Sequence, residues 1–231
     1  MKASPKSLAI GAGIAVAAFA AVLVVAQMIP GPSQLEMEEE ANPQRAALMS
    51  ALLDNSHPPL GSADAPITLV EFGDYQCHFC NVFFHDTEEE IIRNYVDAGL
   101  VRMVFKDRTI IGPDSVVAAR GGWCAQDQNL FWEYHDTVYS HWAGENNGWA
   151  SLDNLRGFAE EAGLDVQQWS SCMAASTHSE KVAASNEDAR RLGVGGTPAF
   201  FVIGPDGDVL GIQGAQPYEQ FARVFDGILE G

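Results

Sequence analysis

The sequence predicts an α/β domain behind an N-terminal membrane or signal segment. An apolar run at residues 67–72 precedes a helical pattern over residues 81–98, and a second apolar run follows at residues 100–105. Strand, helix and strand with short joints are typical of a parallel βαβ unit. Near the C-terminus, a hairpin signal at residues 204–207 separates two short apolar runs and precedes a final helix.

The bulk composition is that of an acidic protein with enough apolar residues for a core. The chain has 231 residues, 47% hydrophobic content and a net charge of −18. Phosphates would be repelled by this charge, so we expect no nucleic-acid partner. No repeat with a period of 20–50 residues is visible, which argues against a repeat architecture.

The N-terminal segment predicts export. Residues 8–29 carry no charge and are long enough to cross a ~30 Å hydrocarbon layer as a helix. Lys2 and Lys6 place the N-terminus inside and the rest of the chain outside. A cleaved signal peptide is the alternative, with residues 24–26 as a cleavage site, but the length favours a retained anchor. Either alternative places the domain on the exported side of the cytoplasmic membrane, in the periplasm or at the cell exterior, where disulfides persist.

We divide the chain into three parts. They are a signal anchor or signal peptide, a juxtamembrane linker and a compact domain, at residues 1–30, 31–60 and 61–231. Leu48, Leu52 and Leu53 form an apolar stripe at helical spacing, so the linker is expected to contain a short helix over residues 43–53.

The middle of the compact domain is predicted to be helical. Apolar and polar residues alternate at helical spacing over residues 115–126, 130–141, 152–162, 166–174 and 180–192. Joints rich in Gly and Asn separate these segments. We therefore expect a helical insertion over about residues 114–192, followed by strands at 199–203 and 208–212 and a helix at 217–229.

Cys77 and Cys80 form a C-x-x-C pair between the first strand and the first helix. At a helix N-terminus, unsatisfied N–H groups and the positive end of the dipole stabilise a thiolate. The pKa of such a cysteine can fall from about 8.5 to roughly 3.5–7.5. We predict that Cys77 is the nucleophile and that Cys80, one turn inward, resolves the mixed disulfide.

Other uses of a C-x-x-C pair fit less well. Zinc needs four ligands, and Cys124 and Cys172 do not form a second such pair. Haem attachment needs a histidine directly after the second cysteine, where this chain has Asn81. A static structural disulfide stays open as an alternative. We predict no metal and no dissociable cofactor.

Three sequence runs, at residues 71–80, 124–136 and 193–201, resemble the DsbA-like family of exported thiol–disulfide oxidoreductases. The resemblance covers about residue 61 to the C-terminus and implies a thioredoxin-like fold with a helical insertion. It also implies that Pro198 is a cis-proline facing the active-site cysteines. Thr197, before it, would offer its backbone to an incoming peptide.

Two further residues are candidates for tuning the cysteine pair. His78 can donate to the Cys77 thiolate or add charge nearby, although the family often carries Pro-His where this chain has His-Phe. The alternative is a histidine that faces solvent. Glu71 matches an acid of the family that would lie buried and exchange a proton with Cys80. The alternative is that strand alternation points Glu71 at solvent.

The other two cysteines, Cys124 and Cys172, both fall in the predicted insertion. An even cysteine count in an exported protein suggests a disulfide, and two buried free thiols are the alternative. Some DsbA-like proteins carry a second, structural bridge of this kind. His135 and Asp136 adjoin each other on a helix and point in different directions, so we expect structural roles for them.

The predicted function is an exported oxidase that forms disulfides at Cys77 and Cys80 in reduced or unfolded exported proteins. A membrane redox partner would recycle the pair, and we expect a monomer. Threonine before the cis-proline is also found in reductases and isomerases, so a reductase or isomerase of the same fold is one alternative. A non-catalytic binding or chaperone module with a structural disulfide is an alternative from another class.

Overall fold

The computed structural model describes residues 42–231. The predicted anchor or signal segment, at residues 8–29, lies outside this part of the chain. Among residues 42–231, no helix has the length and apolar character needed to cross a membrane.

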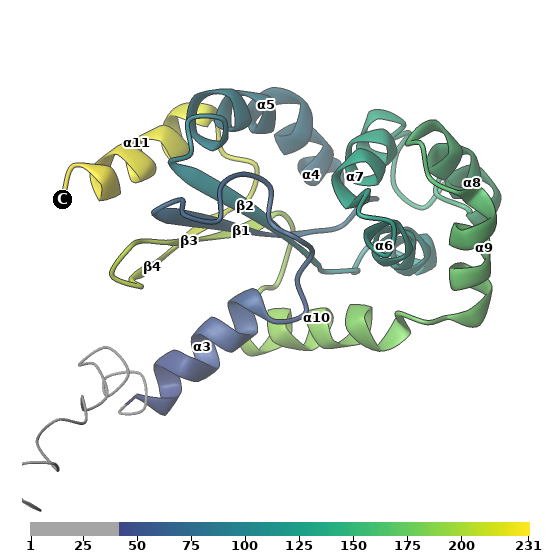
Figure 1. Cartoon of the computed structure of the whole chain (residues 1–231), viewed down its shortest axis with the longest axis horizontal. Helices are drawn as coiled ribbons and strands as arrows, with labels where there is room; N and C mark the ends of the chain where they lie inside the picture. The colour runs from purple at the N-terminus through teal and green to yellow at the C-terminus, as the bar shows by residue number, and fades with distance from the viewer. Residues whose placement is uncertain (1–41) are drawn as a thin grey trace, which may run out of the picture. The chain divides into compact units, whose positions relative to one another are not determined.

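A sheet of four strands lies at the centre of the fold, with strand order β2-β1-β3-β4 (Figure 1). The strands are β1 (Ile67–Gly73), β2 (Val101–Asp107), β3 (Ala199–Ile203) and β4 (Val209–Gln213). β1 pairs with β2 in parallel and with β3 in antiparallel orientation, and β3 pairs with β4 in antiparallel orientation. The structure confirms the predicted order of βαβ, helical insertion and ββα.

The helical run between β1 and β2 begins earlier than its sequence pattern predicts. It consists of α4 (His78–Phe83), the π-helical turn η1 (Phe84–Glu88), α5 (Glu89–Ile91) and the π-helical turn η2 (Ile92–Val96). Cys77 is the N-cap of α4. Gly99, at φ +72°, follows the end of the run in a backbone conformation that glycine adopts without steric cost. Both active-site cysteines therefore belong to the first turn of this run.

Alternate residues of β1 face opposite sides of the sheet. Ile67 and Leu69 pack with aromatic and aliphatic residues of α4, α5 and α11 (Tyr218–Leu229). Val70 and Phe72 pack with Leu52 and with α10 on the other side. Figure 1 shows α5 and α11 on one face and α3 and α10 on the other. Because Glu71 alternates with Val70 and Phe72, it points to the face that α4 covers.

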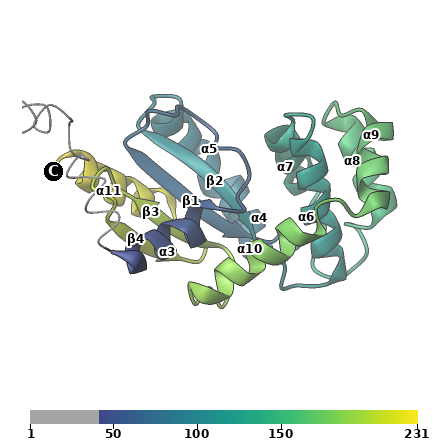
Figure 2. The ribbon, with the colours of Figure 1, turned by 60° about the horizontal axis from the view of Figure 1, so that its bottom comes forward.

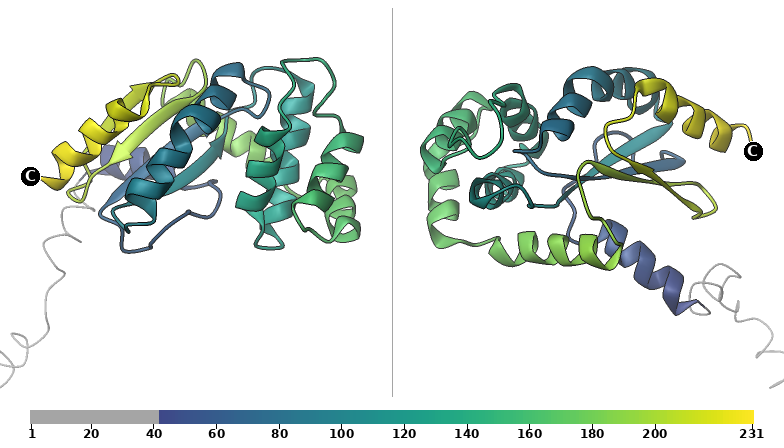
Figure 3. Two further views of the ribbon diagram at one scale, coloured as in Figure 1. Left: turned by 90° about the horizontal axis from the view of Figure 1, so that it is seen from above. Right: turned by 180° about the vertical axis from the view of Figure 1, so that it is seen from behind.

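The insertion forms the five predicted helices, each within two residues of its predicted bounds. They are α6 (Pro113–Gln126), α7 (Phe131–Ser140), α8 (Leu152–Glu161), α9 (Val166–Ala175) and α10 (Ser179–Arg191). Figure 2 shows α6–α9 packed beside the end of the sheet where α4 begins. Figure 3 shows α10 running back from α9 along the sheet. The insertion thus forms one wall around the start of α4.

Residues 47–60, the C-terminal part of the predicted linker, pack as part of the compact unit. Helix α3 (Pro43–Leu53) forms as predicted, but Leu52 is completely buried against β1 and α10, and His57 is 1% exposed. The His57 ring stacks on Phe131 at 3.8 Å between ring centroids. Contacts within the chain group Ala47–Gly231 as one compact unit. The leucine stripe was visible in the sequence, but the surface that covers it comes from distant residues.

Replacing Leu52 with alanine tests this packing. We expect Leu52→Ala to lower the free energy of unfolding by about 2–5 kcal/mol, because it removes buried methyl groups and leaves a cavity. Chemical denaturation of the variant measures the change. The matched control is Leu210→Ala, whose side chain is 49% exposed and whose loss should cost less than about 0.5 kcal/mol. Equal effects of the two substitutions would contradict a core role for α3.

Candidate active site

The loop before α4 is held by the carboxylate of Asp74. One of its oxygens accepts the backbone N–H groups of Ile110 and Ile111, at 2.7 and 2.9 Å, and the other accepts that of Gln76 at 2.9 Å. The Cys77 N–H donates to the Asp74 carbonyl at 2.9 Å. This side chain therefore ties the start of α4 to the loop that follows β2.

The two active-site cysteines are free thiols that lie close to a cis peptide bond. Cys77 is 4% and Cys80 is 1% exposed. The Cys77 Sγ donates a hydrogen bond to the Thr197 carbonyl at 3.3 Å, and the Thr197–Pro198 bond is cis, as the family resemblance implies. Residues that are 120 positions apart in the chain thus meet at one sulfur.

The surroundings of Cys77 favour its ionised form. A hydrogen bond from the Cys80 thiol is the largest influence and lowers the pKa of Cys77, which comes to about 6 instead of 9.0. Burial opposes this effect, while the Thr197 side chain and the backbone N–H groups of Phe79 and Cys80 assist it. The Thr197 hydroxyl has no hydrogen-bond partner while both cysteines are thiols, so it can donate to an ionised sulfur.

Cys80 behaves in the opposite way. Burial raises its pKa well above the usual value, and the hydrogen bond to Cys77 and the charge of Glu71 raise it further. At neutral pH the pair therefore holds a thiolate at Cys77 and a proton at Cys80. This arrangement allows the Cys77 thiolate to attack a disulfide and keeps Cys80 protonated until it resolves the mixed disulfide.

Glu71 is buried beneath the pair, which settles the two alternatives that its strand position left open. Its side chain is on the face that α4 covers, and the residue is 3% exposed. Burial, followed by the negative charge of Cys77, raises the pKa of Glu71 from 4.5 to about 8. At neutral pH this carboxyl is mostly protonated and can give a proton to a nearby sulfur.

His78 faces solvent. Its ring lies 5.2 Å from the Phe79 ring and 5.5 Å from the Trp142 ring, between centroids, and none of the interactions among the described residues joins it to the Cys77 sulfur. Its backbone N–H donates to a Glu145 carboxylate oxygen at 3.0 Å. The hydrogen-bond donors that favour the Cys77 thiolate are therefore other groups.

Gln76 is a site residue that the sequence analysis missed. It is completely buried, and its side chain donates to Ser115 Oγ at 2.9 Å and accepts the Asn146 N–H at 3.0 Å. Trp142 Nε1 donates to its carbonyl at 3.0 Å. Gln76 thus connects the loop before Cys77 to the insertion. A glutamine in a predicted loop carries no sequence signal for such a role.

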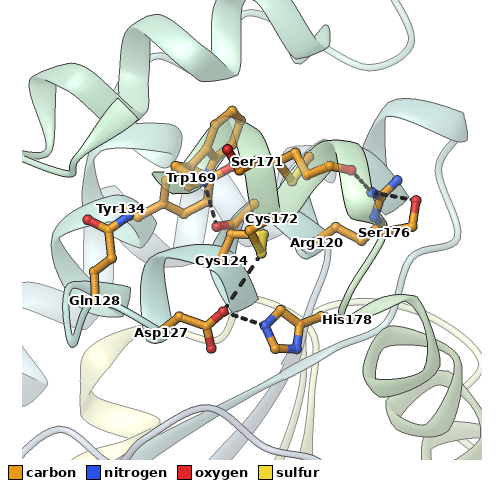
Figure 4. The surroundings of a disulfide bond; sticks show 12 residues. Arg120, Cys124, Asp127, Gln128, Tyr134, Trp169, Ser171, Cys172, Ser176 and His178 are labelled. Carbon is orange, nitrogen blue, oxygen red and sulfur yellow. Dashed lines mark hydrogen bonds and ion pairs between the residues drawn. A yellow bond between two sulfur atoms is a disulfide. The ribbon is translucent and has the colours of Figure 1, made fainter. Parts of the chain in front are cut away.

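Cys124 and Cys172 form a disulfide between α6 and α9 (Figure 4). Beside it, His178 Nε2 and Asp127 Oδ2 form a hydrogen bond at 2.7 Å. These two residues and Cys172 could hold a metal by position, but the sulfur is already oxidised. Two groups of residues among residues 42–231 could hold a metal by position, and neither of them includes Cys77 or Cys80. The bridge joins two insertion helices.

An activated thiol at a helix N-terminus, a protonated partner thiol one turn away and a cis-proline beside them define the class of thiol–disulfide oxidoreductases. Comparison with known proteins agrees with this class. Residues 54–226 match the family model described as Thioredoxin. The chain belongs to the thioredoxin family and, within it, to the DsbA-like thiol–disulfide oxidoreductases.

Individual relatives give the extent of the similarity. The chain is 31% identical over 149 residues to the "Probable disulfide bond formation protein D" of Bacillus cereus, covering 63% of this chain and 69% of the relative. The protein of the same name from Bacillus anthracis is 29% identical over 218 residues, which cover 91% of this chain and 95% of that relative. The crystal structure of oxidised BdbD from Bacillus subtilis superimposes with a TM-score of 0.69 at 24% identity, covering 76% of this chain and 94% of that one.

The hydrogen bond between the two thiols leads to a first prediction for the site. In the reduced protein, we expect the rate of Cys77 alkylation by iodoacetamide to be half-maximal near pH 6. Cys80→Ala removes the strongest influence that lowers the pKa of Cys77, so the midpoint should rise towards 9.0. Cys80→Ser is the matched control, because its hydroxyl can still donate and should keep the midpoint lower. An unchanged midpoint in Cys80→Ala would refute this account of the activation.

The second bridge leads to a prediction about stability alone. We expect the double substitution Cys124→Ala and Cys172→Ala to lower the free energy of unfolding by about 2–4 kcal/mol, because the unfolded chain gains conformational freedom. The alkylation midpoint of Cys77 should stay near pH 6. Denaturant titration and alkylation of the same variant measure both quantities. A shifted midpoint with unchanged stability would argue against a structural role.

Proposed function

We propose that this oxidoreductase works as an exported oxidase that forms disulfides in reduced substrate proteins. The observation that carries the proposal is the stabilised Cys77 thiolate, whose pKa is about 6. Interactions that stabilise the reduced pair make its disulfide easier to reduce and therefore more oxidising. The names of the Bacillus relatives, disulfide bond formation protein D, agree with this direction.

The proposed reaction begins with the disulfide form of the pair. A substrate thiolate attacks Cys77 Sγ, the Cys77–Cys80 bond breaks, and Cys80 leaves as a thiolate that takes a proton from Glu71. A second substrate thiolate attacks the substrate sulfur of the mixed disulfide. The substrate disulfide forms, and Cys77 leaves as the stabilised thiolate. Two electrons thus pass from the substrate to the pair.

Recycling reverses the roles of the two cysteines. The Cys77 thiolate attacks a disulfide of a membrane redox partner, and Cys80 gives its proton to Glu71 and attacks Cys77 Sγ. The partner leaves with both electrons as a dithiol. We propose such a partner because the reaction needs an electron acceptor and because residues 8–29 would hold the domain at a membrane.

Thr197 and Pro198 are proposed to bind the substrate backbone. The Thr197 carbonyl accepts the proton of the Cys77 thiol, and this hydrogen bond is lost when Cys77 ionises or carries a substrate sulfur. The carbonyl is then available to an extended peptide, as in strand addition. Phe79, which is 59% exposed beside the pair, offers an apolar contact for an unfolded segment.

The proposed location is the exported side of the cytoplasmic membrane, with residues 8–29 as an anchor and the domain acting as a monomer. The uncharged length of this segment supports anchoring. The Cys124–Cys172 bridge supports an oxidising compartment, because disulfides persist there and are rare in a reducing cytosol.

The redox equilibrium of the Cys77–Cys80 pair with glutathione tests the direction of electron flow. We expect the pair to be reduced at glutathione potentials well above those that reduce a typical structural disulfide, which lie below about −300 mV. A wild-type equilibrium titration, quenched with acid and read by mass spectrometry, gives the value. A strongly reducing pair would transfer the assignment to a reductase or isomerase of the same fold.

Trapping experiments test the roles of the two sulfurs. Cys77→Ser should abolish turnover of a reduced, unfolded substrate, because no activated sulfur remains to be attacked. Cys80→Ala cannot form the active-site disulfide, but with a disulfide-containing substrate it should accumulate mixed disulfides, because Cys77 attacks the substrate disulfide and the resolving thiol is missing. Non-reducing gel electrophoresis separates the two results. Turnover by Cys77→Ser would exclude the proposed chemistry, whereas absence of turnover by the wild type would favour a binding or chaperone module.

A further inference from the structure

A second group of buried polar side chains lies near the active site, and the exchange reaction does not account for it. We call Glu88 of η1 together with His135 and Asp136 of α7 the acid–imidazole cluster. Glu88 is 2% and His135 is 1% exposed, whereas the Asp136 side chain is 58% exposed. His135 Nδ1 and Asp136 Oδ1 are 3.0 Å apart. The cluster thus begins in the interior and ends at the surface.

The three members of the cluster bring their polar atoms together in one place. A side-chain oxygen of each acid and a ring nitrogen of His135 all lie within 4.8 Å of one another. His135 Nδ1 already contacts Asp136, and His135 Nε2 is buried without a hydrogen-bond partner. The imidazole therefore has one nitrogen engaged towards the surface and a second nitrogen available inside.

Two more unpartnered groups lie in the same region. The hydroxyls of Tyr75 and Tyr139 are buried and lack hydrogen-bond partners, like His135 Nε2. The Tyr139 ring is 4.9 Å from the His135 ring and 5.0 Å from the Tyr75 ring, between centroids. Buried polar atoms normally have partners, and a native structure keeps few exceptions. Three exceptions that share one aromatic cluster point to a function in handling protons.

Electrostatic interactions connect this region to the cysteine pair. Burial is the largest influence on Glu88 and raises its pKa from 4.5 to about 8. The charge of His135 lowers this pKa, and the charges of Glu71 and Asp136 raise it by smaller amounts. Glu71 has a pKa of about 8 as well. Proton transfer between two acids of similar pKa costs little free energy, so either can hold the proton in turn.

We propose that the acid–imidazole cluster carries protons between the buried Glu71 carboxyl and solvent. The inference rests on the proposed function, in which Glu71 gives a proton to Cys80 and takes it back. Because Glu71 and Cys80 are both buried, the carboxyl needs a route to water to regain its proton in each turnover. Glu88 and His135 do not touch the reacting sulfur and affect it only through Glu71. They are therefore positioning residues and not catalytic residues.

The proton balance follows the oxidase direction. When Cys80 leaves the disulfide, Glu71 protonates its sulfur and becomes a carboxylate. Glu88 returns a proton to Glu71 and takes one from His135 Nε2. A proton from solvent binds the Asp136 carboxylate and passes to His135 Nδ1, which then donates to that carboxylate as in the reduced protein. One proton enters from solvent and one reaches Cys80 Sγ, and the recycling step moves one proton in the reverse direction.

The groups that face the two buried acids come from several elements. Around Glu71 they are Cys77 and Cys80 at the start of α4, Tyr75 in the preceding loop and Tyr139 of α7. Around Glu88 they are His135, Asp136 and Glu71. Any pH profile of the reaction therefore reports this set as a whole.

The test measures the step in which Cys80 leaves. The oxidised full chain is mixed with glutathione between pH 5 and 9, quenched with acid, and assayed for the mixed disulfide by mass spectrometry. We expect Glu88→Gln to slow this step by roughly tenfold near pH 7, and we expect Asp136→Asn to slow it as well.

Increasing the concentration of imidazole buffer at constant pH and ionic strength should restore part of the rate that these variants lose. The iodoacetamide midpoint of Cys77 should stay near pH 6.

Matched controls separate proton transfer from general effects. Glu90→Gln makes the same change two residues away on the exposed side of α5. Asp127→Asn removes the carboxylate from the His178–Asp127 pair, a second histidine–carboxylate contact beside the structural disulfide. Both controls should react like the wild type. If Glu88→Gln and Asp136→Asn match their controls at every pH, the relay is refuted.

Glu71→Gln distinguishes failure of the relay from failure of the proposed function. If Glu71→Gln is slow while the cluster variants are not, Glu71 keeps its role and the relay alone falls. If Glu71→Gln is as fast as the wild type, its role in the exchange and the relay fall together. A change in the free energy of unfolding without any dependence on buffer concentration would assign the cluster a purely structural role. Asp136→Asn is informative even if Glu88→Gln is unstable, because its side chain is exposed.

Discussion

The chemistry of this protein depends on a balance between burial and hydrogen bonding at one sulfur. Burial alone would keep Cys77 protonated, because a thiolate loses the solvation that water provides. The Cys80 thiol, the Thr197 side chain and the backbone N–H groups of Phe79 and Cys80 outweigh that cost and hold the pKa near 6. The Cys80 and Phe79 donors come from the first turn of α4, whereas Thr197 reaches the sulfur from the loop before β3.

The same burial has the opposite result where such donors are missing. Cys80 and Glu71 are as buried as Cys77, and the pKa of each is raised. The negative charge of Cys77 adds to the effect at Glu71, so loss of that charge in a mixed disulfide makes Glu71 easier to ionise. Electron transfer at one sulfur is thereby coupled to proton affinity at the neighbouring acid, with Glu88 extending the coupling towards α7.

The insertion contributes to the site as well as covering it. Gln76 connects the loop before Cys77 to α6 through Ser115 and to the α7–α8 loop through Asn146. Asp74 performs the corresponding task for the loop after β2. Because these contacts use buried, charged or polar groups with specific partners, they define the position of the sulfur more narrowly than apolar packing alone. The insertion is thus part of the framework that positions the thiolate.

Local patterns were enough to predict the strands, the five insertion helices and the C-x-x-C pair at a helix start, because periodicity and turn residues act over a few positions. Pro198 was predicted from the family resemblance. The sequence could not decide whether Glu71 was buried, that α3 packs on the sheet, or that Gln76 and Glu88 lie near the site. Each of these depends on a partner far along the chain, such as Asn146 for Gln76 at a separation of 70 residues. Burial and charge coupling arise only when distant segments meet, so tertiary structure decided which ordinary acids and amides became part of the redox site.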